Sequence, residues 1–241
     1  MLLKSELKYI QSLFHKKGRD QEGLFIAEGP KIVTEFSADK TIRIRKIYAL
    51  PSFLNKIKIA IDSTEVTEEE LQKISQNKTP NEVLAVVEKI KWEENSKSKD
   101  SICITLDTIQ DPGNLGTIIR LADWFGVKQI VCSLNCADVY NSKVVQSSMG
   151  SIARVQVEYL DLKTWFQENS ESRIYGATLN GRDVTSMEKI KKGIIVIGNE
   201  SKGISEELLP FINVQITILG KGKAESLNAG VATGIILSHL I

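Results

Sequence analysis

The sequence predicts an α/β protein in two parts, a small mixed unit followed by a larger unit built on a parallel sheet. After residue 101, apolar strand-like runs alternate with helical patterns, which is typical of a parallel sheet covered on both faces. The stretch 89–101, KIKWEENSKSKDS, loses this apolar periodicity and indicates a domain boundary. We therefore expect domains at 1–90 and 102–241, joined by a linker at 91–101.

The first unit is expected to mix helices and strands over about ninety residues. In order, these elements are an amphipathic start (Leu3, Leu7, Ile10, Leu13 and Phe14), a strand in GLFIAEG, a helix from about Lys31, a strand near RKIYAL, a helix in TEEELQKIS and a strand in EVLAVVEKI.

The second unit is expected to repeat strand and helix. The pairs are ICITLD with NLGTIIRLADWFG, QIVCS with SKVVQSSMG, and VQVEYL with LKTWFQEN; then come the strand RIYGATL, the strand GIIVIGN with a Ser205-capped helix in SEELLP, and the strand VQITILG with a final helix in SLNAGVATGIILSHLI.

Composition limits the class of protein. With 241 residues, of which 42% are hydrophobic and 25% charged, the chain can bury one large core or two small ones. No apolar run reaches membrane-spanning length and the start lacks a signal-peptide core, so we expect a cytoplasmic protein. Cys103, Cys132 and Cys136 make no set of four ligands, so we expect free thiols and no metal.

The first twenty residues are basic although the formal net charge of the chain is only +1. Lys16, Lys17 and Arg19 are candidate RNA contacts, because phosphate contacts position a nucleic acid without reading its sequence. From charge alone, the same residues could form a solvated helix face.

Three loops of the second unit carry polar side chains where apolar strands end. They hold Asn114 and Arg120 in the first loop, Gly198 and Glu200 in the second, and Ser226 and Asn228 in the third. Each residue alone has a plainer explanation as a helix cap, a surface charge or a glycine turn. Their position favours function, because ligands of open α/β sheets bind beyond the carboxyl ends of strands.

The glycines of the third loop exclude the common nucleotide-binding loops. Gly220 and Gly222 form neither a GxGxxG fingerprint nor a Walker sequence. A dehydrogenase of the Rossmann type is therefore not expected.

In this order and spacing, the loops resemble the motifs of the SpoU/TrmH family of RNA 2′-O-ribose methyltransferases, in the knotted SPOUT superfamily. Asn114 and Arg120 match the first motif, Gly198-Asn199-Glu200 the second, and Ser226-Leu227-Asn228 the third. The stretch 148–150 is similar to an intermediate family element. Arg19, Phe25, Glu28 and Gly29 are similar to a small RNA-binding domain whose fold resembles certain ribosomal proteins.

The resemblance implies a cofactor, a topology and a set of site residues. It implies S-adenosylmethionine as methyl donor, a deep carboxy-terminal trefoil knot, and a homodimer through the final helix and the helix after Asn114. The implied donor contacts are Thr178, Leu179, Gly198, Ile218, Gly220 and Leu227. The implied catalytic residues are Arg120, Asn114, Glu200, Ser226 and Asn228.

A ribose hydroxyl is a very weak acid, so its attack on a methyl group needs removal of the proton as the new bond forms. The hydroxyl must also be aligned with the methyl group. No histidine or cysteine lies near the motifs. The resemblance makes Arg120 the base, but a guanidinium is protonated at neutral pH. Arg120 is therefore either the base or a clamp on phosphate that positions the hydroxyl.

The expected function is S-adenosylmethionine-dependent 2′-O-ribose methylation of structured RNA, with large-subunit ribosomal RNA as the favoured substrate. Methylation of transfer RNA is one alternative. A non-catalytic RNA-binding or ribosome assembly factor of the same fold is the other.

Overall fold

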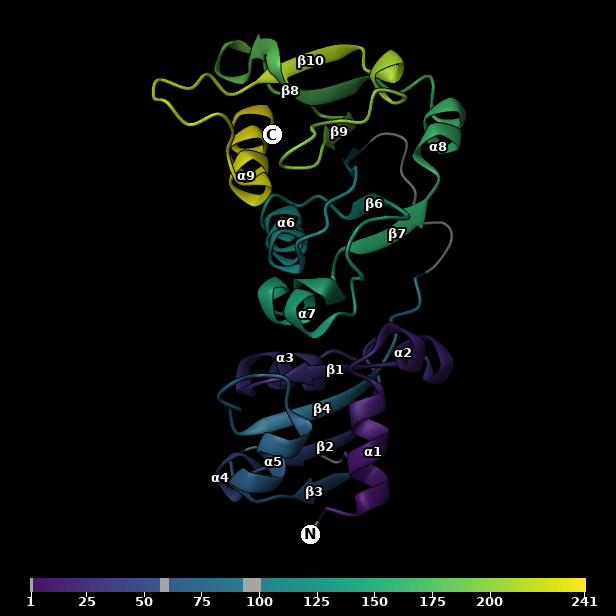
Figure 1. The fold of residues 1–241 in the computed structure, drawn as a ribbon, viewed down its shortest axis with the longest axis vertical. Helices are drawn as coiled ribbons and strands as arrows, with labels where there is room; N and C mark the ends of the chain where they lie inside the picture. Colours follow the sequence, from purple (N-terminus) through teal and green to yellow (C-terminus); the bar gives the residue numbers. More distant parts are fainter. Residues whose placement is uncertain (1, 57–60, 93–100) are drawn as a thin grey trace. The chain divides into compact units, whose positions relative to one another are not determined.

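A computed structural model describes residues 2–56, 61–92 and 101–241. The chain divides into two compact units (Figure 1). The amino-terminal unit is Met1–Lys91 with Asp138–Ala153, and the carboxy-terminal unit is Trp92–Ala137 with Arg154–Ile241. The segment Asp138–Ala153, which the sequence places in the second domain, thus packs with the first. Most of the expected linker 91–101 lies outside the described residues.

The amino-terminal unit contains a mixed four-stranded sheet. Its order is β1 (Leu24–Glu28), β4 (Val83–Glu88), β2 (Ile44–Ala49) and β3 (Ser63–Glu65). Strand β4 runs antiparallel to both β1 and β2, whereas β2 and β3 are parallel. The helices of this unit are α1 (Lys4–Ser12), α2 (Lys16–Glu22), α3 (Pro30–Ala38), α4 (Pro51–Leu54), α5 (Glu68–Ile74) and α7 (Ser142–Ser148). The sequence did not predict β3 or α4, which are only three and four residues long.

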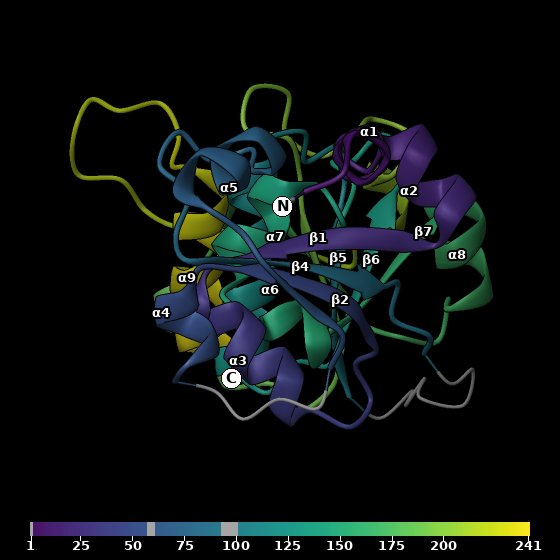
Figure 2. The same cartoon turned by 90° about the horizontal axis from the view of Figure 1, so that it is seen from below.

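Both faces of β1 are buried, which explains its continuous apolar run. Side chains alternate between the faces of a strand, and Leu24 and Ile26 join the core formed with α1 and α5. On the other face, the ring of Phe25 lies 6.3 Å from that of Phe36 in α3 and 4.7 Å from that of Tyr140. Figure 2 shows α1 and α5 on one side of this sheet and α3 on the other.

The carboxy-terminal unit is built on a six-stranded sheet in which every pairing is parallel, so the predicted architecture is confirmed. The strand order is β10 (Val214–Thr217), β8 (Ile174–Asp183), β9 (Gly193–Ile197), β5 (Ile102–Leu106), β6 (Gln129–Ser133) and β7 (Gln156–Leu160). Helix α8 (Leu162–Glu168) covers one face, and α6 (Pro112–Trp124) and α9 (Ala229–Leu240) lie on the other (Figure 1).

Helices α6 and α9 approach each other closely because glycines of α9 face α6. A Cβ atom on Gly230 would lie 2.9 Å from Cγ2 of Thr117, and one on Gly234 would lie 3.4 Å from a methyl group of Leu121. This intrachain contact uses part of the small-residue surface of the final helix. It also brings the first residues of both helices to the same edge of the sheet.

The prediction of a helix in SEELLP is wrong. Residues 206–208 form turns, followed by a 3₁₀ helix at Leu209–Phe211. The hydroxyl of Ser205 does not cap a helix but donates to Asp107 at 2.7 Å. Pro210 also lacks the N–H that a continuing helix would need.

Within the described residues, no helix is both long and apolar enough to cross a bilayer. The same part of the chain holds no group of three or more His, Cys, Asp or Glu side chains that could bind a metal ion.

Candidate active site

The three motif loops meet through a chain of side-chain hydrogen bonds. The amide of Asn228 donates to Oδ1 of Asn114 at 2.7 Å, and the amide of Asn114 donates to a carboxylate oxygen of Glu200. These residues are 114 and 86 positions apart in sequence. One asparagine thus joins the loops that follow β5, β9 and β10.

The side chain of Asn114 is free for this role because another residue caps α6. Asp111 is the N-cap and accepts the N–H of Asn114 at 2.8 Å, so the capping explanation considered for Asn114 is wrong. Asn228 does cap α9, accepting the N–H groups of Gly230 and Val231 at 3.0 and 3.2 Å. Since the cap uses only Oδ1, the amide group of Asn228 remains available to Asn114.

The loop that carries Glu200 is held close to the end of β9. Asn199 and Gly203 exchange backbone hydrogen bonds of 3.0 and 2.8 Å, and Gly203 has a φ of +70°. A Cβ atom on Gly198 would lie only 2.2 Å from the carbonyl carbon of Gly203. Glycine at 198 is therefore required by this close approach.

Two predicted catalytic residues stand outside the hydrogen-bonded chain. Arg120 is exposed on α6 and makes no hydrogen bond or ion pair within the described parts of the chain. Arg120 lies six residues after Asn114, so the two side chains point about 120° apart around the axis of α6. Ser226 is also exposed, on the loop before α9, and has no hydrogen-bond partner among the described residues.

The predicted donor contacts lie within β8, after its neighbours β10 and β9, and just before α9. The register between β10 and β8 shifts between Gln215 and Ile216, so residues 177–181 bulge out of the pairing. Thr178 and Leu179 lie on this bulge, and the carbonyl of Leu179 accepts the hydroxyl of Thr217 at 3.2 Å. Ile218 and Gly220 follow β10, Gly198 follows β9, and Leu227 precedes the cap of α9.

These loops expose apolar side chains where the resemblance predicts contacts with the adenine and ribose of S-adenosylmethionine. Leu179, Leu219 and Leu227 are 74, 64 and 44% exposed. Apart from the adjoining residues, no atom of the described chain lies within 4 Å of the Cβ position of Gly220 or Gly222, so the backbone there is open to a ligand. An apolar surface with nearby backbone amides is the usual composition of a site for such a cofactor. Leu219 was not predicted, although it adjoins Ile218 in the same loop.

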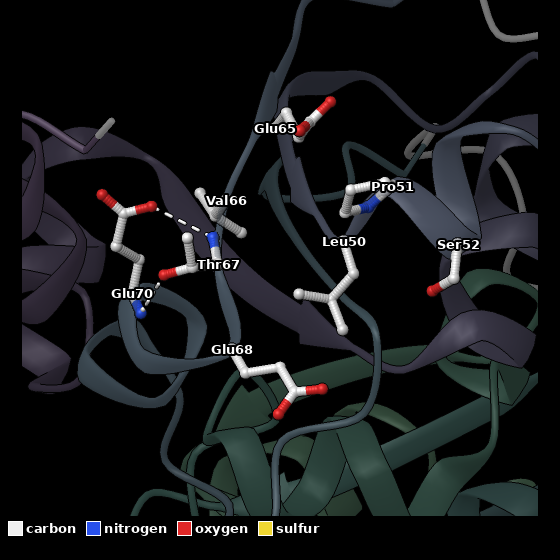
Figure 3. Close-up of a pocket in the computed structure, with 8 residues that line it drawn as sticks. All are labelled: Leu50, Pro51, Ser52, Glu65, Val66, Thr67, Glu68 and Glu70. Carbon is white, nitrogen blue, oxygen red and sulfur yellow. Dashed lines mark hydrogen bonds between the residues drawn. The ribbon is translucent and has the colours of Figure 1, made fainter.

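A separate hollow of about 510 Å³ lies in the amino-terminal unit and does not correspond to the motif loops. Figure 3 shows Leu50, Pro51 and Val66 in its wall together with three glutamates, Glu65, Glu68 and Glu70. Glu70 forms a capping box with Thr67, whose N–H it accepts at 3.0 Å. Carboxylates repel phosphate, so we assign no RNA contact to this hollow.

Arg19 is not placed to contact RNA. Its side chain is buried, and the guanidinium donates to the carbonyls of Leu13 and Phe14 at 3.0 and 2.9 Å and to Asp138 at 2.6 Å. Burial and inward hydrogen bonds make it a structural residue, which corrects the prediction. Lys16 and Lys17, by contrast, are exposed on α2.

Two cysteines lie beside the loop that leads into α6. Hydrogen bonds from Cys132, Ser133 and the N–H of Ile109 lower the pKa of Cys136 to about 7, against the effect of burial. The pKa of the fully buried Cys132 is raised, first by its hydrogen bond to Cys136 and then by burial. The Ile109 N–H lies 3.2 Å from Sγ of Cys136, so this thiol helps to hold the loop.

Comparison with known proteins accounts for both units. Residues 101–238 match the model of the SpoU rRNA Methylase family, and residues 4–85 match an MRM3-like substrate binding domain. The chain belongs to the SpoU rRNA methylase family. Members of this family are RNA methyltransferases that use S-adenosylmethionine.

Relatives of this SpoU family chain include enzymes of ribosomal RNA. It is 28% identical to the 23S rRNA (guanosine(2553)-2′-O)-methyltransferase RlmP of Bacillus subtilis, over 98% of this chain and 95% of that protein. A Porphyromonas gingivalis structure described as an RNA methyltransferase of the TrmH family is 33% identical, covering 99% and 98% of the two chains with a TM-score of 0.85. An rRNA methyltransferase from Sinorhizobium meliloti, bound to AdoMet, is 26% identical over 99% and 95% with a TM-score of 0.85.

Proposed function

We propose that this chain transfers a methyl group from S-adenosylmethionine to a ribose 2′-oxygen of large-subunit ribosomal RNA in the cytoplasm. The observation that carries the proposal is the Asn228–Asn114–Glu200 chain, which joins three polar loops beside exposed apolar side chains. The named activity of the B. subtilis relative over almost the full length supports the substrate class.

In the proposed reaction, the 2′-oxygen forms a bond to the methyl carbon while the bond from that carbon to sulfur breaks. S-adenosylmethionine supplies an electrophilic methyl group when bound. Asn114, held by Glu200 and Asn228, orients the target ribose, and Ser226 offers a free hydroxyl to the same nucleotide. The in-line geometry of such a transfer depends on this positioning.

Arg120 acts in this proposal as a clamp on an RNA phosphate beside the target ribose. A charged guanidinium presents several donors in a fixed plane and suits phosphate recognition. Arg120 is exposed and is not engaged by the described parts of its own chain, so it is available to a substrate. The hydroxyl proton then leaves to solvent water.

The donor is held by the bulge within β8 and by the loops that follow β9 and β10. Leu179, Leu219 and Leu227 line the adenine, while backbone near Thr178, Gly198, Ile218 and Gly220 supplies donors and acceptors. A topological knot in the carboxy-terminal unit, as the SPOUT superfamily implies, would keep these loops together.

RNA selection falls to the amino-terminal unit, where the exposed Lys16 and Lys17 contact phosphates. The match of residues 4–85 to a substrate binding domain supports this assignment.

The active form is proposed to be a homodimer that pairs through α6 and α9. Trp124 on α6 is 82% exposed and Val231 on α9 is 53% exposed. Large apolar side chains in water favour association. Sedimentation of the wild type and of a Trp124→Ser/Val231→Ser variant tests this, since a dimeric wild type and a monomeric variant are expected.

The function is tested by mapping ribose methylation in cells with and without the gene. Loss of one 2′-O-methyl group in large-subunit ribosomal RNA, restored by the wild-type gene, is expected. Loss confined to transfer RNA would identify the other substrate class. Unchanged methylation, together with no donor binding by calorimetry, would indicate a non-catalytic RNA-binding protein.

A further inference from the structure

The loop that carries Glu200 is tied to the end of β5 by a buried carboxylate. Asp107 is only 3% exposed. Its Oδ2 atom accepts both the N–H and the hydroxyl of Ser205, each at 2.7 Å, and its Oδ1 atom accepts the hydroxyl of Thr108 at 2.9 Å. Asp107 makes no ion pair within the described residues, so three neutral donors balance its buried charge.

A second tie lies beside the first. The amide of Asn199 donates to the carbonyl of Thr108 at 2.9 Å, and Oδ1 of Asn199 accepts the N–H groups of Ser201 and Lys202 at 3.0 and 3.2 Å. We call Asp107, Thr108, Asn199 and Ser205 the β5–β9 clamp. It fixes both ends of the loop on whose turn Glu200 lies.

The backbone of Thr108 shows that the clamp is held against a local cost. Its φ of +57° is in the left-handed region, which a β-branched residue rarely adopts because the conformation is strained. The surroundings stabilise this conformation, because its N–H donates to Ser133 at 2.9 Å while its carbonyl accepts Asn199. Such outliers cluster at functional sites.

We infer that the β5–β9 clamp positions Glu200 for methyl transfer, and that Asp107 is a positioning residue of the active site. The inference rests on the proposed function. Between the ends of the clamp, residues 201–203 are exposed. The Asn199–Gly203 backbone pair closes the turn on itself, whereas the clamp ties that turn to β5 and the Asn114 contact holds the Glu200 carboxylate. Without the clamp the carboxylate shifts, and Asn114 turns away from the target ribose.

The first test compares Asp107→Ala, Asp107→Asn and Ser205→Ala. A displacement of about 1 Å at a catalytic group can cost about 100-fold in rate, so Asp107→Ala lowers kcat by about 10- to 100-fold while the KM for RNA changes little. Asn retains an acceptor for Ser205 and gains a donor toward Thr108, so Asp107→Asn stays within about threefold of wild type. A loss in Asp107→Asn equal to that in Asp107→Ala would overturn a positioning role.

A double-mutant cycle asks whether the clamp acts through Glu200. In a Glu200→Ala background, Asp107→Ala should cause no further loss of kcat, because the group that it positions is already absent. An equal loss in both backgrounds would show that Asp107 acts by another route. Ser205→Ala, which removes one hydroxyl only, serves the same cycle if Asp107→Ala fails to fold.

Hydrogen exchange separates this inference from the proposed function. Amides of residues 199–205 should exchange faster in Ser205→Ala and Asp107→Ala than in wild type or Asp107→Asn. This readout needs no methyl transfer, so it decides the clamp even if wild-type protein methylates no RNA. Unchanged exchange in both destabilising variants would overturn the inference.

Discussion

The amide of Asn228 donates to Oδ1 of Asn114 at 2.7 Å, linking the N-cap residue of the final helix to the first turn of α6. Asn228 thereby caps its own helix with one atom and orients a neighbouring loop with another. The two tasks can be separated by mutation.

Asn228→Asp should keep the cap and lose the link to Asn114. A carboxylate accepts from Gly230 and Val231 but cannot donate to Asn114. We expect methyl transfer to fall about 10- to 100-fold with little change in melting temperature. Asn228→Ala should lose the same activity and about 1 kcal/mol of stability as well. Wild-type turnover in Asn228→Asp would exclude the orienting role.

Arg120→Ala should abolish most activity without affecting the fold. Because Arg120 is exposed and makes no hydrogen bond or ion pair with the described residues, unfolding free energy should change by less than about 0.5 kcal/mol. We expect kcat/KM to fall about 100- to 1000-fold, with unchanged donor affinity by calorimetry. Arg173→Ala, which removes an exposed arginine just before the first residue of β8, is the control for loss of one positive charge. A similar loss in that control would point to a general charge effect.

Leu227→Ala and Leu219→Ala should weaken donor binding specifically. Each side chain is exposed without donor, so folding stability should not change, but burying a leucine against a ligand contributes about 1.5 kcal/mol or more. The dissociation constant for S-adenosylmethionine should therefore rise about tenfold. Leu134→Ala removes an equally exposed leucine outside these loops and should bind the donor normally. Normal binding in all three variants would move the donor site elsewhere.

Lys16 and Lys17 should contribute to RNA affinity through phosphate alone. Replacing both by alanine should weaken binding of all RNA sequences alike. The slope of log binding constant against log salt concentration should become shallower by about 1 for each lysine lost. Filter binding at several salt concentrations measures this, with Lys73→Ala on α5 as control. An unchanged salt dependence would remove both lysines from the interface.

Arg19→Ala should instead destabilise the amino-terminal unit. Removing one partner of a buried ion pair leaves Asp138 uncompensated and costs about 3–5 kcal/mol. Urea unfolding measures the loss, and Arg19→Ala/Asp138→Asn should recover part of it. Full stability in Arg19→Ala would mean that the buried pair contributes nothing.

Cys136 should make stability depend on pH near neutrality. Its pKa is lowered to about 7 in the folded protein, so the thiolate stabilises the fold above the unfolded value of 9.0 and this contribution disappears as pH falls through 7. Urea unfolding at pH 6.5 and 8.5 should show a gain with pH that Cys136→Ser lacks. The same pH dependence in both proteins would contradict the lowered pKa.

The sequence predicted the regular elements better than the loops between them. Apolar runs such as ICITL became buried strands because their composition suits a two-sided parallel sheet. Ser205 was taken for a cap because its partner, Asp107, lies 98 residues away, and local pattern cannot show such a pairing. The prediction that Arg19 contacts RNA was wrong for the same reason, since its partner Asp138 lies 119 residues away.

The sequence supplied the candidate residues of the site but not their geometry. Motif spacing singled out Asn114, Glu200 and Asn228, and the structure joins them by hydrogen bonds. The order of these bonds depends on Asp111 taking the cap of α6. Aspartate before proline and three residues ahead of Asn114 is a recognisable cap signature. The exposed bulge at Leu179 had no comparable signature, because it arises from a register shift in the sheet.

The glycine-mediated contact of α9 with α6 gives the site an evolutionary constraint. The separation of Asn228 from Asn114 depends on how near the two helices lie, and Gly230 faces Thr117 with no room for a larger group. In related sequences, a larger residue at position 230 should therefore occur only together with a smaller residue at position 117. Such covariation would reflect selection for the separation between Asn114 and Asn228.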